Sequence, residues 1–131
     1  MAHQPATPRK EGPASITLYW LFAQSRVSDH VFCGTVKLGN FSLGRNFTVH
    51  LPAGSYWFRM SDKKKAIHLA VGQGGEYFVR VSPFGGNHLE LVEHDIGEAE
   101  AVETRPLESG KILDVRAASL NNLQADPHTK K

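Results

Sequence analysis

The sequence predicts an all-β fold: an antiparallel β-sandwich of about seven strands, followed by a short C-terminal helical segment. Apolar and polar residues alternate with a period of two in five separate segments, as expected of strands that bury one face. Glycine, proline and asparagine clusters separate these segments at intervals of roughly 8–12 residues, which is the spacing of a sandwich or a barrel.

The strands are justified in chain order by these apolar runs and by the turn residues between them. Strands are expected over residues 16–22, 31–38, 41–43, 47–51, 55–60, 66–71, 77–81 and 88–93. Gly39-Asn40 and Gly44-Arg45-Asn46 are predicted to be turns. Leu51-Pro52-Ala53-Gly54 is predicted to be a tight turn that pairs the central strand Ser55–Met60 with strand 46–51 on one side, while strand 66–71 flanks it on the other.

The chain divides into three parts. Residues 1–14 are rich in proline and predict a disordered lead, and residues 15–105 form the sandwich domain. Residues 106–131 form a C-terminal extension that is partly helical and frays at its end. Helix is confined to residues beyond Asp95, either in the acidic stretch that starts there or over Ser109–Asn122, where leucine and alanine recur at helical spacing.

Charge and composition exclude several classes of function. Residues 15–105 carry nine Lys/Arg and nine Asp/Glu, so the domain is neutral. A neutral domain binds the phosphate backbone of a nucleic acid poorly, and no nucleic-acid partner is expected. The only basic cluster, Lys63-Lys64-Lys65, is interpreted as a solvated turn. No apolar run is long enough to span a membrane, and the first residues do not resemble a signal peptide. We expect a cytoplasmic protein, or a periplasmic or envelope-associated one whose signal was removed.

No pattern of catalytic or metal-ligating residues is evident. Cys33 is the single cysteine and is interpreted as a buried apolar residue. Seven histidines show no HxH or HxxxH spacing, so no metal site and no cofactor are predicted. The sequence has no nucleophile elbow and no cysteine with an evident base, so we expect no enzyme.

Several phrases together resemble a known family. These are the opening strand SITLYWLF, the turn at VKLGN, the central FTVHLPAGSYWFRM, the later LAVGQGGEYFVRVSP and the closing LELVEHDIGEAE. In this order they resemble the bacterial DUF2846 family of uncharacterised proteins and, more loosely, PEGA-type and transthyretin-like β-sandwiches. The resemblance covers about residues 15–103 and implies a β-sandwich at the cell envelope with no established catalytic residues.

The candidate binding residues follow from the alternation in the central strand. If Tyr56, Phe58 and Met60 face the core, Trp57 and Arg59 share the opposite face. Neighbouring strands are expected to add further polar and aromatic side chains to that face, namely His50, His68, Phe78 and Arg80. An exposed tryptophan beside an arginine is typical of a contact surface. A C-terminal helix covering that face would instead make Trp57 a core residue.

Two functions of different classes fit this arrangement. The first is a non-enzymatic module that binds or positions a protein partner, or a second copy, at a bacterial cell envelope. The alternative is a carbohydrate- or small-ligand-binding module that uses the aromatic face around Trp57.

Overall fold

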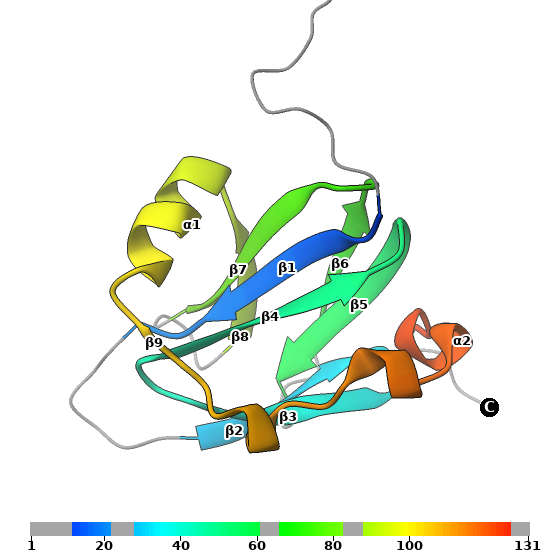
Figure 1. Ribbon diagram of the computed structural model, residues 1–131, viewed down its shortest axis with the longest axis horizontal. Helices are drawn as coiled ribbons and strands as arrows, with labels where there is room; N and C mark the ends of the chain where they lie inside the picture. The colour runs from blue at the N-terminus through cyan, green and yellow to red at the C-terminus, as the bar shows by residue number, and fades with distance from the viewer. Residues whose placement is uncertain (1–11, 22–27, 61–65, 83–87, 127–131) are drawn as a thin grey trace, which may run out of the picture.

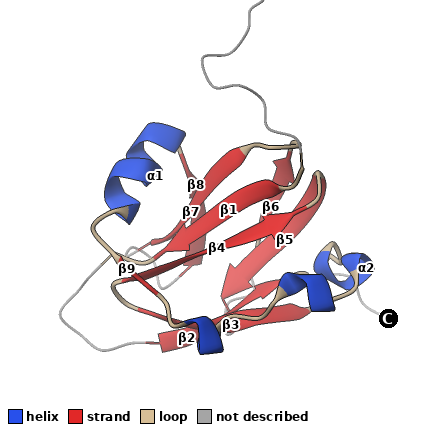
Figure 2. Cartoon of the chain, viewed as in Figure 1, coloured by secondary structure: helices blue, strands red, loops and turns tan. Residues whose placement is uncertain are grey.

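The computed structural model describes residues 12–21, 28–60, 66–82 and 88–126. Over these residues the chain is mostly β, with short helical segments at its periphery (Figures 1 and 2). The strands are β1 (Ala14–Tyr19), β2 (Ser28–Cys33), β3 (Val36–Ser42), β4 (Arg45–Leu51), β5 (Gly54–Met60), β6 (Ile67–Val71), β7 (Glu76–Ser82), β8 (His88–Val92) and β9 (Arg105–Pro106). The helical segments are α1 (His94–Ala101), the 3₁₀ turns η1 (Ser109–Lys111) and η2 (Val115–Ala117), and α2 (Leu120–Leu123). The predicted Lys63-Lys64-Lys65 turn, the frayed chain end from residue 127 and residues 1–11 of the predicted lead lie outside the described residues.

The strands form two sheets, as in a β-sandwich, but one of the sheets is mixed. The four-stranded sheet has the order β3-β2-β5-β6 and is antiparallel throughout. The five-stranded sheet has the order β8-β7-β1-β4-β9, and its pairs β1–β7 and β4–β9 are parallel. The prediction of a purely antiparallel fold is therefore wrong for this sheet. Because β1 lies between two strands that run in opposite directions, it must be parallel to one of them.

The core lies between the two sheets and follows the predicted alternation. On the central strand β5, Tyr56, Phe58 and Met60 are fully buried, whereas Trp57 and Arg59 between them are half-buried. Apolar side chains from both sheets complete the core, among them Ile16, Leu18, Val31, Leu38, Phe41, Val49, Leu51, Val79 and Val81. The alternation therefore separates an inner from an outer face on each sheet.

The segment 31–38 was predicted as one strand, and it is two. A turn at Gly34-Thr35 separates β2 from β3, and Gly34 has a φ of +62°, a conformation that favours glycine. Conversely, the predicted turn at Gly39-Asn40 lies inside β3, where a register shift accompanies the pairing with β2. A Cβ at Gly39 would clash with the backbone of Lys111, so this glycine permits close approach of the C-terminal segment.

The connection from β4 to β5 crosses from one sheet to the other. Strand 46–51 is therefore not paired with the central strand, contrary to the prediction of a hairpin at Leu51–Gly54. The strands that flank β5 are β2 and β6. Only Pro52 and Ala53 separate β4 from β5, and Pro52 cannot donate to a sheet ladder.

The C-terminal segment runs along the side of the molecule where β3 and β4 lie (Figure 1). Ile112 forms a bridge with Gly39, and the Leu113 amide donates to the Leu38 carbonyl at 2.7 Å. Further on, the Thr35 amide donates to the Asn122 carbonyl at 3.0 Å. Helix was predicted over Ser109–Asn122; the structure has two 3₁₀ turns and one α-helical turn, because the bridge at Ile112 requires an extended backbone.

Helix α1 begins at His94 and packs on the outer face of β7. Gly97 is its one buried residue, and a Cβ there would clash with the Phe78 side chain, so the helix lies close to the strand. No helix in the described ranges is long and apolar enough to cross a membrane.

Candidate functional site

The outer face of the four-stranded sheet carries two pairs of stacked side chains. The indole of Trp57 stacks on the imidazole of His68, with ring centroids 4.4 Å apart and planes inclined by 24°. Two residues further along β5, the Arg59 guanidinium lies 4.4 Å from the centre of the Phe32 ring on the neighbouring strand β2, a cation–π arrangement. We call these four residues the aromatic face.

The sheet register explains why these side chains meet. Trp57 is directly opposite His68 in the β5–β6 pair, and Arg59 is directly opposite Phe32 in the β2–β5 pair. Side chains directly opposite each other in antiparallel strands lie on the same face and within contact distance. The aromatic face therefore spans three adjacent strands and is fixed by backbone pairing.

The C-terminal segment does not make Trp57 a core residue. Trp57 is half-buried and His68 is exposed, whereas α2 buries Leu123 near Cys33 and Gly34, at the turn between β2 and β3. Lys37 is exposed and is directly opposite Phe32, which extends the aromatic face toward β3.

The structure does not bring all six predicted binding residues together. Trp57, Arg59 and His68 share the aromatic face. His50, Phe78 and Arg80 belong to the five-stranded sheet, so they lie on the other side of the core. They were grouped with Trp57 because strands β4 and β7 were expected next to the central strand, and neither is.

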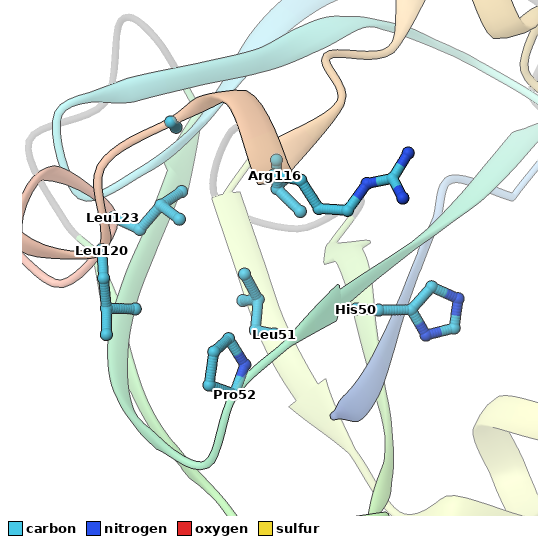
Figure 3. Close-up of a pocket in the computed structure, with 8 residues that line it drawn as sticks. His50, Leu51, Pro52, Arg116, Leu120 and Leu123 are labelled. Carbon is cyan, nitrogen blue, oxygen red and sulfur yellow. The ribbon is translucent and has the colours of Figure 1, made fainter. Parts of the chain in front are cut away.

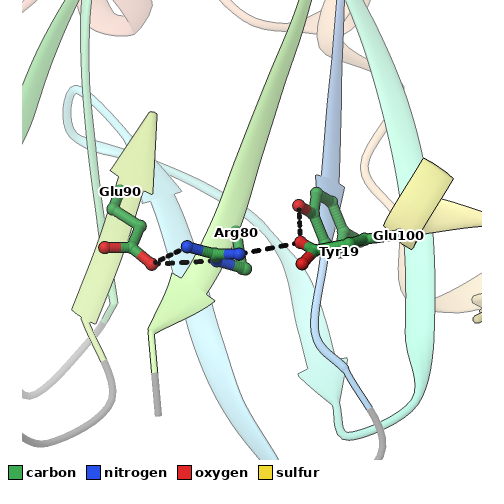
Figure 4. A network of polar contacts seen from close by, with 4 residues as sticks. All are labelled: Tyr19, Arg80, Glu90 and Glu100. Carbon is green, nitrogen blue, oxygen red and sulfur yellow. Dashed lines mark hydrogen bonds and ion pairs between the residues drawn. The ribbon is translucent and has the colours of Figure 1, made fainter. Parts of the chain in front are cut away.

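Arg80 belongs to a polar network beneath α1 (Figure 4). Its guanidinium forms ion pairs with Glu90 on β8 and with Glu100 on α1, each at 2.8 Å. The hydroxyl of the buried Tyr19 donates to the same Glu100 carboxylate at 2.5 Å. The network thus joins β1, β7 and β8 to the helix.

Two pKa shifts follow from this network. Burial, together with the hydrogen bond to Glu100, raises the pKa of Tyr19. Partial burial alone would raise the pKa of Glu100, but hydrogen bonds from Tyr19 and Arg80 outweigh it and lower that pKa below its ordinary value. The Glu100 carboxylate therefore accepts hydrogen bonds that attach α1 to the sheet. A general acid would need a raised pKa, and that of Glu100 is lowered.

An apolar hollow of about 170 Å³ lies between the end of β4 and the C-terminal segment (Figure 3). Pro52, Leu120 and Leu123 lie on one side of it, and His50 and Arg116 on the other. A second hollow of about 410 Å³ adjoins it and shares His50 and Arg116. Arg116 is highly exposed and already paired with Asp114 at 2.9 Å, so the first hollow could hold only a small apolar group.

One group of described residues has the ligand types for a metal ion. One ligand atom each from His94, Asp95 and Glu98 lies within 4.8 Å of the others at the start of α1. The His94 ring also contacts Glu76 at 2.9 Å, and this hydrogen bond chiefly raises the pKa of His94. Because a metal ion binds the neutral imidazole, the raised pKa means that a proton competes with a metal for this ring.

Cys33 is fully buried, as expected for an apolar role. Burial raises its pKa to about 12, and its Sγ donates to the Leu123 carbonyl at 3.3 Å. A thiol in this state is a poor nucleophile.

The sequence interpretation missed two residues, Phe32, which belongs to the aromatic face, and Lys37, which is adjacent to it. Both lie in the segment 31–38 that was read as one strand, so their outward direction was not recognised. The signal that could have found them is the glycine in Cys33-Gly34-Thr35, which breaks the run. The Tyr19–Glu100 contact joins residues 81 apart in the chain and has no local signal.

No family model, curated protein or solved structure matches the chain.

Proposed function

We propose that the chain is a non-enzymatic β-sandwich module that binds or positions a protein partner through the aromatic face. The observation that supports this most is the half-burial of Trp57 in a stacked pair on an outer sheet face. Tryptophan and arginine are the residues most enriched at interface hot spots, and a hot spot needs partly exposed side chains whose positions are fixed in advance.

The stacking partners favour a protein over a sugar. One face of the Trp57 indole is occupied by His68, and the Arg59 guanidinium rests on Phe32. These contacts restrict side-chain rotation before binding, which lowers the entropic cost of forming an interface. A sugar that stacks on Trp57 would have only the opposite face of the indole.

The reactive groups of the described residues support a role without catalysis. The Cys33 thiol is buried with a raised pKa, and the Glu100 carboxylate is committed to Tyr19 and Arg80. The location at a bacterial cell envelope is part of the proposal and rests on the sequence resemblance to the DUF2846 family.

Photo-cross-linking in the cells that produce the protein tests this proposal. The cross-linker p-benzoylphenylalanine replaces Ser55, an exposed neighbour of Trp57 on β5, and replaces Thr48 on the outer face of the other sheet as a control. We expect protein adducts from position 55 that are lost in a Trp57→Ala background and kept in a His50→Ala background. Equal adducts from positions 55 and 48 would refute the proposal. Absence of protein adducts, with glycan binding that depends on Trp57, would favour the carbohydrate alternative.

A further inference from the structure

We infer that the partner of the aromatic face contributes an extended segment, which pairs with the open edge of β6 and adds a strand to the four-stranded sheet. The inference rests on the proposed function and names the form of the partner. Two independent observations carry it: the direction of the backbone groups of β6, and the exposure of one leucine on β8.

The backbone groups of His68 and Ala70 on β6 point away from the rest of the sheet. The Gly34 amide donates to the Trp57 carbonyl at 2.7 Å, so the backbone groups of Trp57 point toward β2. In an antiparallel ladder, the residues of a strand alternate between its two neighbours in this respect. Because His68 is directly opposite Trp57, its N–H and C=O point away from β5, and so do those of Ala70 two residues further on. Both residues are exposed.

Strand β6 has none of the features that protect the edge strands of sheets. It contains no lysine, arginine, carboxylate or proline, and it shows no register shift against β5. At the other edge of the same sheet, the C-terminal segment covers β3, where Ile112 forms a bridge with Gly39. Among the described residues, none forms a backbone hydrogen bond with the outer side of β6. Within this part of the chain the sheet is therefore covered at β3 and open at β6.

Leu91 on β8 faces the core side of its sheet and is nevertheless 55% exposed. It is directly opposite Val79 on β7, which is fully buried, and residues directly opposite each other share one face of a sheet. Strands β8 and β6 are the last strands of their two sheets and contact each other across the core. A strand added beside β6 extends the four-stranded sheet on the side where Leu91 is uncovered.

These two observations define the chemistry of the added segment. Its residues beside His68 and Ala70 exchange backbone hydrogen bonds with them, and their side chains lie on the outer face next to the Trp57–His68 stack. The residues between point to the core side, where apolar side chains would cover Leu91. In this mode of recognition the main chain supplies affinity and alternate side chains supply specificity. Neither a helix nor a sugar offers unpaired backbone groups at the spacing of a strand.

A second copy of this chain is a poorer occupant of the edge. Pairing of β6 with β6 of another copy would leave Leu91 uncovered, because Leu69 and Val71 are already buried in the core of their own copy. Two edges of five residues also bury less area than a stable dimer needs. A segment that joins no sheet before binding has the side chains of both its faces available.

Cross-linking from position 55 in the producing cells, combined with variants of position 70, tests the inference. Ala70 is directly opposite Ser55, so the cross-linker lies beside the added strand. Ala70→Pro removes the N–H that points to the open edge, where a sheet tolerates proline, and Ala70→Val keeps this N–H. We expect Ala70→Pro to lower the yield of protein adducts by about tenfold or more, and Ala70→Val to leave it within about twofold.

A second pair of variants tests the contact with β8. Leu91→Ser removes the exposed apolar side chain on the core side of β8, and we expect it to lower the adduct yield by about fivefold. The matched control is Ile96→Ser on α1, which removes an apolar side chain of similar exposure, 47%, away from β6. This control should keep the wild-type yield.

A synthetic peptide makes the test independent of the folding of any variant. It reproduces the partner sequence around the cross-linked residue and is also prepared in two forms, N-methylated at one or the other set of alternate residues. We expect only one methylated form to lose binding to the wild-type protein, because only one set of amides faces β6. The unmethylated peptide should slow the amide hydrogen exchange of His68 and Ala70 by about tenfold or more.

An Ala70→Pro variant that keeps both its circular dichroism spectrum and its adducts would overturn the inference. So would equal binding of the two methylated peptides, or amides of His68 and Ala70 that are as protected in the free protein as that of Leu69. If Ala70→Pro loses its spectrum, the peptides and Leu91→Ser decide. Adducts that depend on Trp57 but not on Ala70 or Leu91 would keep the aromatic face as a binding surface and reject the added strand, whereas absence of all adducts would reject the proposed function itself.

Discussion

Replacing Glu100 by alanine should detach the C-terminal half of α1 from the sheet at a measurable cost. The substitution leaves the buried Tyr19 hydroxyl without its acceptor, which costs about 1–3 kcal/mol. It also removes one of the two carboxylates of Arg80, whose side chain is 25% exposed, and a partly exposed ion pair contributes about 0–1 kcal/mol. We therefore expect Glu100→Ala to lower the free energy of unfolding by about 1–4 kcal/mol.

Urea unfolding at neutral pH, followed by circular dichroism, measures this effect. The matched control is Glu98→Ala on the exposed side of the same helix, which gains the same helix propensity and should stay within about 0.5 kcal/mol of the wild type. In a Tyr19→Phe background the cost of Glu100→Ala should fall to about 1 kcal/mol, because no hydroxyl is left unpaired. If Glu100→Ala and Glu98→Ala have equal effects, the network does not hold the helix and the reasoning is refuted.

The remaining predictions concern pH, a glycine and metal binding. The pKa of Glu100 is lowered on folding, so its contribution to stability is present above the ordinary glutamate pKa and is lost as the pH falls through the folded pKa. The unfolding free energy of the wild type should therefore fall with acidification more than that of Glu100→Ala, which lacks this carboxylate. Gly54 has a φ of +154°, and a Cβ there would lie 2.5 Å from the Gln124 side-chain nitrogen, so Gly54→Val should destabilise by about 1 kcal/mol or more; an unchanged melting temperature would contradict this. No tight zinc site is expected, and a calorimetric titration that reveals a stoichiometric submicromolar site, lost on His50→Ala, His68→Ala or His94→Ala, would overturn that expectation.

The period-two alternation predicted the inner and outer faces of individual strands well. It separated Tyr56 and Phe58 from Trp57 on β5, because one strand alternates between faces whatever its neighbours are. The alternation carries no information on which sheet a strand joins. His50 was therefore placed beside the central strand, although the chain changes sheets directly after β4.

The missed features depend on contacts between distant segments. Gly39 was interpreted as a turn residue because glycine is common in turns, whereas its role is to admit the backbone of Lys111. The parallel pairing of β1 with β7 joins strands separated by most of the domain, and no local signal specifies it. The candidate site was therefore predictable in part: the outward direction of Trp57 and Arg59 was, and their stacking partner Phe32 was not.

The measurement that tests the aromatic face most directly is the yield of cross-linked protein from position 55 in the Trp57→Ala variant, taken beside its unfolding free energy. The matched reference is Phe58→Ala, which removes a fully buried ring from the opposite face of the same strand and should cost about 3–5 kcal/mol of stability. We predict that Trp57→Ala loses most of the cross-linked product while its stability falls by less than about half of the Phe58→Ala value. An unchanged yield, or a loss of stability equal to that of Phe58→Ala, would contradict the account and make Trp57 a structural residue.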